Sequence, residues 1–164
     1  MSKVRIIENR SEIGAGTRGA SLGVDAIKIA ALNNKSDYFS KHTSSIIKDY
    51  NHFLNNGVLN SRTKSIEILI DLYNSVANEV STVLNGNNFP LILAGDHASA
   101  GGTIAGIKMA NPDKKLGVIW IDAHADIHSP FTSPSGNMHG MSLATALSLD
   151  NENVRINELD PQSL

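Results

Sequence analysis

Cysteine is absent from the 164-residue chain, which excludes disulfides, thiolate zinc sites and cysteine nucleophiles. Neither sign of charge predominates, because the chain has 14 Lys and Arg and 16 Asp and Glu, which gives a formal net charge of −2. The basic residues are scattered, so we expect neither nucleic acid nor a membrane surface as a partner. No apolar run approaches the roughly 20 residues that cross a bilayer, and the first residues lack the apolar segment of a signal peptide. We therefore expect a cytoplasmic protein.

What is present is ordinary for a globular domain: 41% of the residues are hydrophobic and 18% are charged. Val4–Glu8 is short and β-branched, which predicts a strand. Between Arg62 and Leu84 apolar residues recur at alternating steps of three and four, which predicts a long amphipathic helix ended by Gly86. Further helices are expected over 24–32, 99–110 and 140–149, and an irregular excursion with one short helix over 33–60.

Two continuous apolar runs, Leu91–Ala94 and Leu116–Ile121, lack the alternation of half-buried strands. They predict strands buried on both faces of a parallel sheet, with Trp120 and Ile121 in the core. Strands that alternate with helices along a chain are typical of α/β proteins. The expected fold is therefore a doubly wound, mainly parallel α/β sheet.

Side chains that ligate metals gather where these two runs end. His97 follows the first run, and Asp122, His124 and Asp126 follow the second, in DAHAD. Side chains at every second position of an extended segment point the same way, and ligands bind at the carboxyl ends of parallel strands. Two acids this close repel unless a cation or a proton intervenes. The pattern predicts a divalent metal site, and its mixed donors favour manganese or a related ion.

Each residue has a structural alternative when taken singly. Asp96 is suited to capping a helix that begins near Ser99, His97 to an ordinary loop hydrogen bond, and Asp122 to a cap at a strand end. Capping does not explain Asp-x-His-x-Asp after one run together with Asp-His after another, so metal binding is the favoured interpretation.

Four stretches, GAGTRGASLG, AGDHASAGG, WIDAHADIHSP and SGNMHGM, resemble the ureohydrolases and in particular the arginases. Their order and spacing along Ile6–Met141 match the N-terminal portion of an arginase, and SGNMHGM favours arginases over agmatinase-like relatives. The resemblance implies a three-layer α/β/α enzyme with two Mn²⁺ ions that hydrolyses L-arginine to L-ornithine and urea. The nucleophile would be a hydroxide bridging the metals, and the complete enzyme would be a homo-oligomer.

The same resemblance implies a role for each candidate ligand. His97 and Asp126 would bind one ion, His124 would bind the other, and Asp122 would bridge the two. Asp126 would also orient the bridging hydroxide.

Residues of the following loop would act on the substrate. His139 matches the histidine that shuttles protons, a role suited to a group that titrates near neutrality. Ser135 and Asn137 match residues that hold the α-carboxylate of the substrate. His128 occupies a position where arginases commonly have an Asn that binds the substrate carboxylate. The resemblance therefore predicts substrate choice least well at this position.

Other family features have no counterpart before Leu164: a later strand with an Asp-x-Asp pair, a Glu that grips the guanidinium group and an acid for the α-amino group. The terminal NELDPQSL is not the missing pair, because only Glu158 precedes Asp160 and no apolar strand leads into it. Two octahedral ions need on the order of ten to twelve donor positions, more than four residues supply. We expect residues 1–164 to be the truncated N-terminal portion of one arginase-like domain, nearly inactive alone.

Two alternatives remain open from the sequence. One is another ureohydrolase, of the agmatinase or formimidoylglutamase type. The other is a non-catalytic, truncated paralogue that binds metal.

Overall fold

The computed structural model describes residues 3–55, 62–129 and 132–147. Their sheet has three parallel strands in the order β2-β1-β3, formed by β1 (Val4–Asn9), β2 (Ser44–Ile46) and β3 (Phe89–Ala94). β1 is the central strand, with Ile6 opposite Ser44 on one side and Leu91 on the other. The parallel α/β architecture predicted from the sequence is confirmed. β2 was not predicted, because its Ser-Ser-Ile sequence carries no strand pattern and only pairing with β1 defines it.

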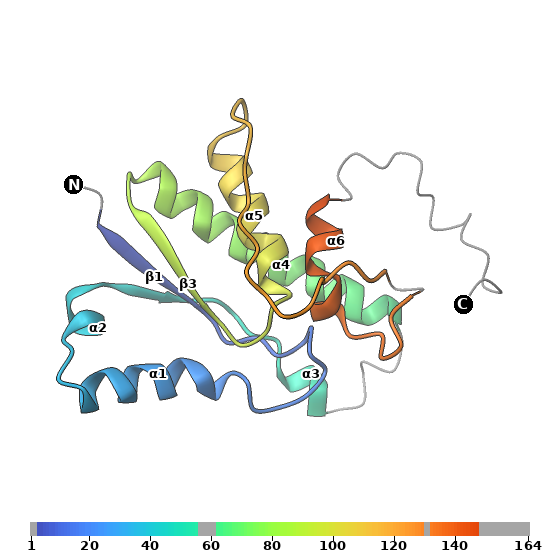
Figure 1. Cartoon of the computed structure of the whole chain (residues 1–164), viewed down its shortest axis with the longest axis horizontal. Helices are drawn as coiled ribbons and strands as arrows, with labels where there is room; N and C mark the ends of the chain where they lie inside the picture. Colours follow the sequence, from blue (N-terminus) through green and yellow to red (C-terminus); the bar gives the residue numbers. More distant parts are fainter. Residues whose placement is uncertain (1–2, 56–61, 130–131, 148–164) are drawn as a thin grey trace.

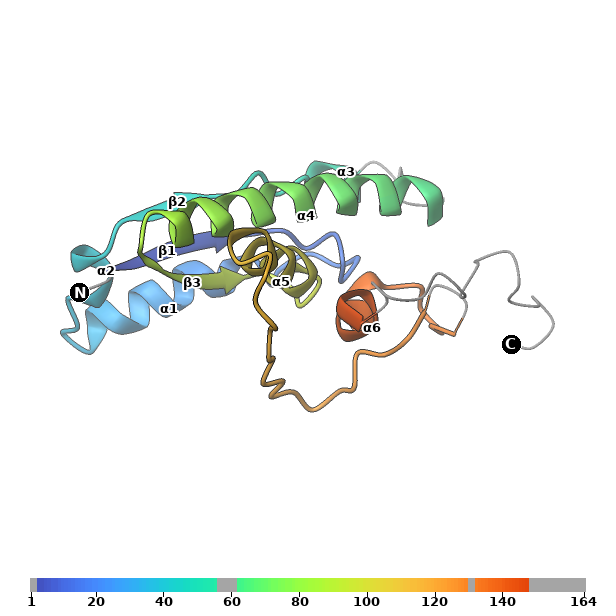
Figure 2. The same ribbon diagram turned by 90° about the horizontal axis from the view of Figure 1, so that it is seen from above.

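Helices lie on both sides of the sheet. In Figure 1, α4 (Arg62–Asn85) lies above the strands and α1 (Leu22–Asn33) below them, and Figure 2 shows α4 running along the sheet. α5 (Ser99–Ala110) packs against α4. The remaining helical elements are α2 (Tyr38–Lys41), α3 (His52–Asn55), a 3₁₀ turn (Met138–Met141) and α6 (Ser142–Leu147). None of the described helices is both long and apolar enough to cross a membrane.

The apolar stripe of α4 forms the core of the described chain. Leu69, Val76 and Val80 of this stripe are buried, and they pack against Ile7 of β1. The stripe predicted from the three-and-four spacing is therefore confirmed. The helix ends one residue later than its pattern suggested.

The C-terminus of α4 is a Schellman motif. Asn88 N–H donates to Val83 O and Asn87 N–H donates to Leu84 O, and Asn87 has the left-handed conformation, with φ of 57°. Asn is the second choice after Gly at that position. The prediction that Gly86 would be the C′ residue is therefore wrong by one position.

The run from Leu116 to Ile121 is not a strand in the structure. Ile119 is 90% exposed and Ile121 is 93% exposed, and a cleft of about 570 Å³ lies between this segment and β3. A strand requires a neighbour for its backbone amides, and none of the described strands flanks this segment. The prediction of a second buried strand is therefore wrong for the described residues, as is the placement of Ile121 in the core; Trp120 is half-buried.

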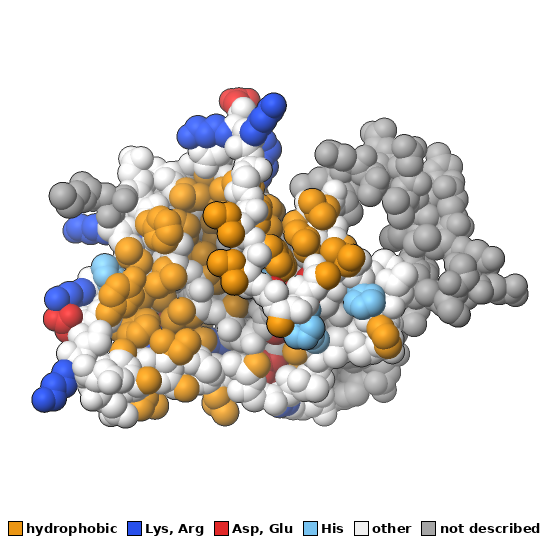
Figure 3. Space-filling view, in the orientation of Figure 1, with side chains coloured by type: hydrophobic (Ala, Val, Ile, Leu, Met, Phe, Trp, Pro, Cys, Tyr) orange, Lys and Arg blue, Asp and Glu red, His pale blue; other side chains and the backbone are white. Residues whose placement is uncertain are grey.

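β3 is also less buried than its sequence predicted. Its six residues are half-buried or exposed, with Phe89 59% exposed. Figure 3 shows apolar side chains gathered over the region of α1 and β3. The predicted helix over 140–149 is present as the 3₁₀ turn and α6, but residues 148–149 and the terminal NELDPQSL lie outside the described residues.

Glycine in α5 allows that helix to approach α4 closely, and this generates a stability prediction. A Cβ at Gly106 would lie 2.5 Å from Ala77 O and 2.8 Å from the Val80 Cβ, whereas a Cβ at Gly23 in α1 would have nothing within 4 Å. We expect Gly106→Ala to lower the free energy of unfolding by about 2 kcal/mol through overpacking. Gly23→Ala should raise it by about 0.5 kcal/mol through helix propensity. Urea unfolding curves measure both, and changes of the same sign would contradict this account of the packing.

Candidate functional site

His97 is positioned by a close contact between the ends of β1 and β3. Gly95 N–H donates to Asn9 O at 2.8 Å, and a Cβ at Gly95 would lie 2.4 Å from Ser11 O, so only glycine fits there. The chain then turns and presents His97 at the carboxyl end of β3. The indole of Trp120 stacks on the His97 ring with centroids 4.5 Å apart and an interplanar angle of 25°. Trp120 therefore packs against the site.

The backbone of Asp126 has an unusual conformation that neighbouring amides fix. Its φ of 51° lies in the left-handed region, where a residue other than glycine is strained unless its surroundings enforce the conformation. The enforcing contacts are the amides of Leu143 and Ala144, which both donate to Asp126 O at 3.0 Å. These amides belong to the first turn of α6 and have no acceptor within that helix. The backbone is thus locked with the Asp126 carboxylate 5% exposed.

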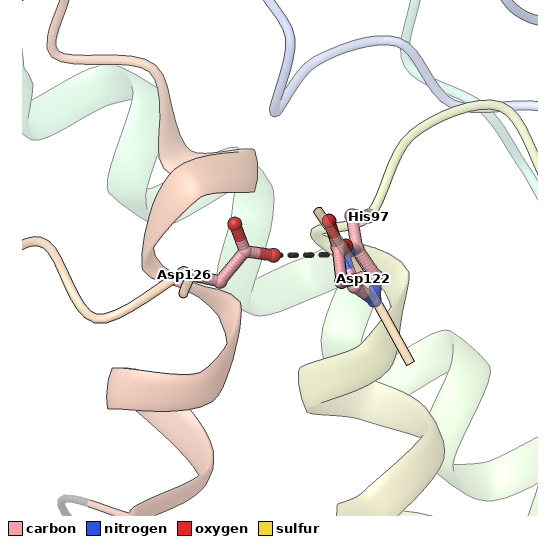
Figure 4. A group of neighbouring side chains, drawn as sticks. All are labelled: His97, Asp122 and Asp126. Atoms are coloured by element: carbon pink, nitrogen blue, oxygen red, sulfur yellow. Dashed lines mark ion pairs between the residues drawn. The ribbon is translucent and has the colours of Figure 1, made fainter. Parts of the chain in front are cut away.

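One imidazole and two carboxylates meet at this point. His97 Nδ1 lies 2.8 Å from Asp122 Oδ2 and 2.7 Å from Asp126 Oδ2. Figure 4 shows Asp126 reaching across from its own loop toward His97 and Asp122. One potential ligand atom from each residue lies within 4.8 Å of the others. The structure therefore brings together three of the four ligands predicted from the sequence.

His124 lies outside that group of three. Its side chain is 85% exposed, and its Nδ1 is 3.3 Å from Asp122 Oδ1. Its backbone N–H donates to the same oxygen at 2.8 Å, and this bond, together with the nearby His97, holds the pKa of Asp122 below its usual value. Asp122 therefore stays ionised beside Asp126.

The Asp126 carboxylate has an unsatisfied oxygen. Oδ2 is buried and accepts no hydrogen bond from the described residues. Its contact with His97 has the distance of an ion pair without the geometry of a hydrogen bond. A buried carboxylate oxygen without a donor is costly, and the cost is higher beside a second carboxylate. A divalent cation with oxygen and imidazole ligands would satisfy all three groups.

The candidate residues all line a single cleft of about 460 Å³. Its wall is formed by the metal-ligand candidates and by residues between 133 and 140 that follow them in the chain. The predicted site residues along its wall are His97, Asp122, His124, Asp126, His128, Ser135, Asn137 and His139.

Loop residues that line this cleft form hydrogen bonds within the loop. Ser135 Oγ accepts a hydrogen bond from Asn137 N at 3.2 Å, and His128 Nδ1 lies 3.3 Å from Thr132 Oγ1. A Cβ at Gly16, whose φ is +67°, would lie 3.0 Å from Asn137 Oδ1. The glycine-rich turn near the start of the chain is therefore a close neighbour of this loop.

His139 and His97 are tied together by a buried hydroxyl. Ser142 is fully buried, and its Oγ lies 2.9 Å from His97 O and 2.7 Å from His139 O. His139 also contacts the glycine-rich turn, with Nδ1 3.0 Å from Gly14 O. Neither contact is predictable from the sequence, because a serine at the start of a helix and a glycine in a turn carry no local sign of a distant partner.

Asp96 is only partly the helix cap considered from the sequence. Its Oδ1 accepts the N–H of Ala98 at 2.9 Å, but α5 begins at Ser99 and has no side-chain cap at Ala98. Its Oδ2 accepts the N–H of Ala15 at 3.1 Å. Burial raises the pKa of Asp96 above its usual value, although the N–H donors of Ala15 and Ala98 oppose that shift.

Several known proteins are similar to this chain in sequence. The family model described as Arginase family matches residues 3–157. The arginase of Brevibacillus brevis is 34% identical over 154 residues, which cover 87% of this chain and 47% of that protein. The arginase of Bacillus subtilis (strain 168) is 35% identical over 154 residues, which cover 92% of this chain and 50% of that protein.

Solved structures of arginases are also similar to this chain. The crystal structure of arginase from Bacillus subtilis has a TM-score of 0.65 at 34% identity and covers 87% of this chain and 46% of that one. The Entamoeba histolytica arginase in complex with L-ornithine has a TM-score of 0.69 at 27% identity and covers 88% and 50%. This chain spans about half the length of the curated relatives that it matches. The match over residues 3–157, together with a parallel α/β fold carrying these motifs, shows that the chain belongs to the arginase family.

Proposed function

We propose that this chain carries metal- and substrate-binding residues of a manganese-dependent site that hydrolyses L-arginine to L-ornithine and urea. The observation that carries the proposal is the single cleft into which the His97, Asp122 and Asp126 group and the Ser135–His139 loop both open. The arginase family membership of the chain supports this reaction class. The relative from Entamoeba histolytica was solved with L-ornithine, the amino acid that this reaction releases.

Divalent cations are held, in this proposal, by His97, Asp122, His124 and Asp126. A set of carboxylate and imidazole donors is typical of Mn²⁺ sites, whereas structural zinc sites are built mainly from thiolates. The buried, unsatisfied Asp126 Oδ2 fits a cation on chemical grounds. When bound, the ions supply Lewis-acid activation of water for attack on the guanidinium carbon.

The protein side chains then position and move protons. The Asp126 carboxylate accepts a hydrogen bond from the attacking water and orients its oxygen toward the guanidinium carbon. As the new C–O bond forms, the C–N bond to the ornithine side chain breaks and the leaving amine needs a proton. The His139 imidazole, which lies on the wall of the same cleft, takes up a proton that the water loses and passes it to this amine.

Recognition of the amino-acid end falls to the loop residues. The hydroxyl of Ser135, the amide of Asn137 and the imidazole of His128 each donate a hydrogen bond to the α-carboxylate of arginine. Agmatine lacks that carboxylate, so these donors favour arginine over agmatine.

Turnover requires more ligands than these four residues offer. Two octahedral ions need on the order of ten to twelve donor positions. We therefore infer that the chain alone turns over slowly and that fast catalysis belongs to a site with the additional acids. Homo-oligomer formation and a cytoplasmic location stay predictions.

The first prediction concerns metal affinity. Asp126→Asn keeps the shape of the side chain but removes a charge from the most buried acid of the group, so the affinity of the chain for Mn²⁺ should fall by more than about tenfold. Isothermal titration with Mn²⁺ measures the change. Asp113→Asn is the control, because Asp113 is exposed and lies outside the cleft. Equal affinity in Asp126→Asn and the unmodified chain would contradict the metal site.

The second prediction concerns substrate choice. Asn137→Ala should weaken binding of L-arginine to the Mn²⁺-loaded chain by about tenfold, the effect of losing one hydrogen bond to a charged group. Binding of agmatine should change little. Titration of both ligands into Asn137→Ala and into the control Asn74→Ala, an exposed position on α4, gives the comparison. Tighter binding of agmatine than of arginine would reassign the chain to the agmatinase type.

The third prediction tests the reaction itself. Urea release from labelled L-arginine by the Mn²⁺-loaded chain should be slow but measurable, and His139→Asn should lower kcat by about a hundredfold with little effect on KM. His52→Asn, at an exposed histidine of α3 that does not line the cleft, should leave kcat unchanged. Urea release that is unaffected by His139→Asn would remove this residue from the mechanism.

A further inference from the structure

The peptide group between Gly14 and Ala15 contacts side chains from two distant parts of the chain. The Ala15 N–H donates to Asp96 Oδ2 at 3.1 Å. The Gly14 carbonyl, at the other edge of the same peptide, accepts from His139 Nδ1 at 3.0 Å and from His139 N at 3.1 Å. Because a trans peptide is planar, its N–H and C=O point in opposite directions. Asp96 and His139 are therefore joined through one rigid unit.

This peptide has little room to move. The second carboxylate oxygen of Asp96 is held by the Ala98 N–H at 2.9 Å. A Cβ at Gly14 would lie 2.5 Å from the Ala98 Cβ and 2.9 Å from Asp96 Oδ1. Gly14 thus lies directly against the start of α5, and Asp96 cannot turn away from Ala15 without losing the Ala98 bond.

The Gly14 carbonyl determines which nitrogen of His139 carries a proton. A carbonyl oxygen has no hydrogen to donate, so Nδ1 must be the donor in this contact. In the neutral ring Nε2 is then the basic atom. In water neutral histidine populates both tautomers, so the contact selects one of them. A carboxylate at the N–H edge polarises the peptide and makes its carbonyl a stronger acceptor.

The geometry points to Asp96 as a positioning residue for His139, acting through the Gly14–Ala15 peptide. It keeps the carbonyl in place and so keeps His139 in the Nδ1–H tautomer, with Nε2 as the atom that exchanges a proton. Asp96 does not touch the substrate. The inference rests on the proposed function for the importance of His139, but the tautomer itself is a property of this chain without metal or substrate.

A simpler role for Asp96 makes a different prediction. If its carboxylate served only the start of α5, its loss would affect the Ala98 amide and leave the His139 ring unchanged. If the peptide transmits its effect, both the Ala15 amide and the His139 tautomer must change.

The test is nuclear magnetic resonance of the ¹⁵N-labelled chain in the absence of metal and substrate. The ¹⁵N shifts of the His139 ring distinguish the Nδ1–H and Nε2–H tautomers. We expect Nδ1–H to predominate in the unmodified chain, and Asp96→Asn to lower the ratio of Nδ1–H to Nε2–H by roughly fivefold. Hydrogen exchange of the Ala15 amide should accelerate by about tenfold in the same variant. Asp113→Asn, the same change at an exposed position, should alter neither measurement.

Two outcomes would overturn the inference. The first is an Nε2–H tautomer of His139 in the unmodified chain, which needs no variant and holds even if Asp96→Asn does not fold. The second is a folded Asp96→Asn chain with faster Ala15 exchange but an unchanged tautomer. Neither depends on urea release, so a failure of arginine hydrolysis with the expected tautomer result would refute the proposed function and leave the positioning role standing.

Discussion

Ligand atoms of two carboxylates and one imidazole lie within 4.8 Å of one another at the carboxyl end of β3. The two carboxylates repel each other, because like charges this close do so, and the imidazole of His97 contacts both of them. The α6 amides fix the backbone of Asp126 through its carbonyl oxygen, and the His124 amide donates to the Asp122 carboxylate. Asp126 remains strained in its backbone and unsatisfied at Oδ2. Local strain and unsatisfied polar groups are typical of functional sites.

The loop over the cleft depends on the other end of the chain. Gly14 O binds His139, which lies 125 residues later, and Gly16 leaves room for Asn137. The buried Ser142 hydroxyl connects the backbone of His97 to that of His139. Direct contacts thus connect the metal-ligand candidates, the substrate-binding candidates and the glycine-rich turn that follows β1.

Contact between His97 and Asp122 does not require the strand pairing that the sequence led us to expect. The 116–121 segment is separated from β3 by a cleft, yet the side chains that follow the two segments still meet. His97 stands on a turn fixed by Gly95, and Trp120 stacks on its ring. The side chains of His97 and Asp122 extend from these turns and meet with 2.8 Å between His97 Nδ1 and Asp122 Oδ2.

Local pattern by itself determined the long helix, the presence of strands near 4–8 and 91–94 and the identity of the candidate donors, because apolar periodicity and motif spacing are properties of neighbouring residues. Only the tertiary structure decided that His124 stays outside the group of three, that Asp126 is buried in a left-handed conformation and that 116–121 remains unpaired. It also decided the short strand at 44–46 and the contact between Gly14 and His139. These features depend on pairing and packing between residues far apart in the chain, and no local periodicity records such partners.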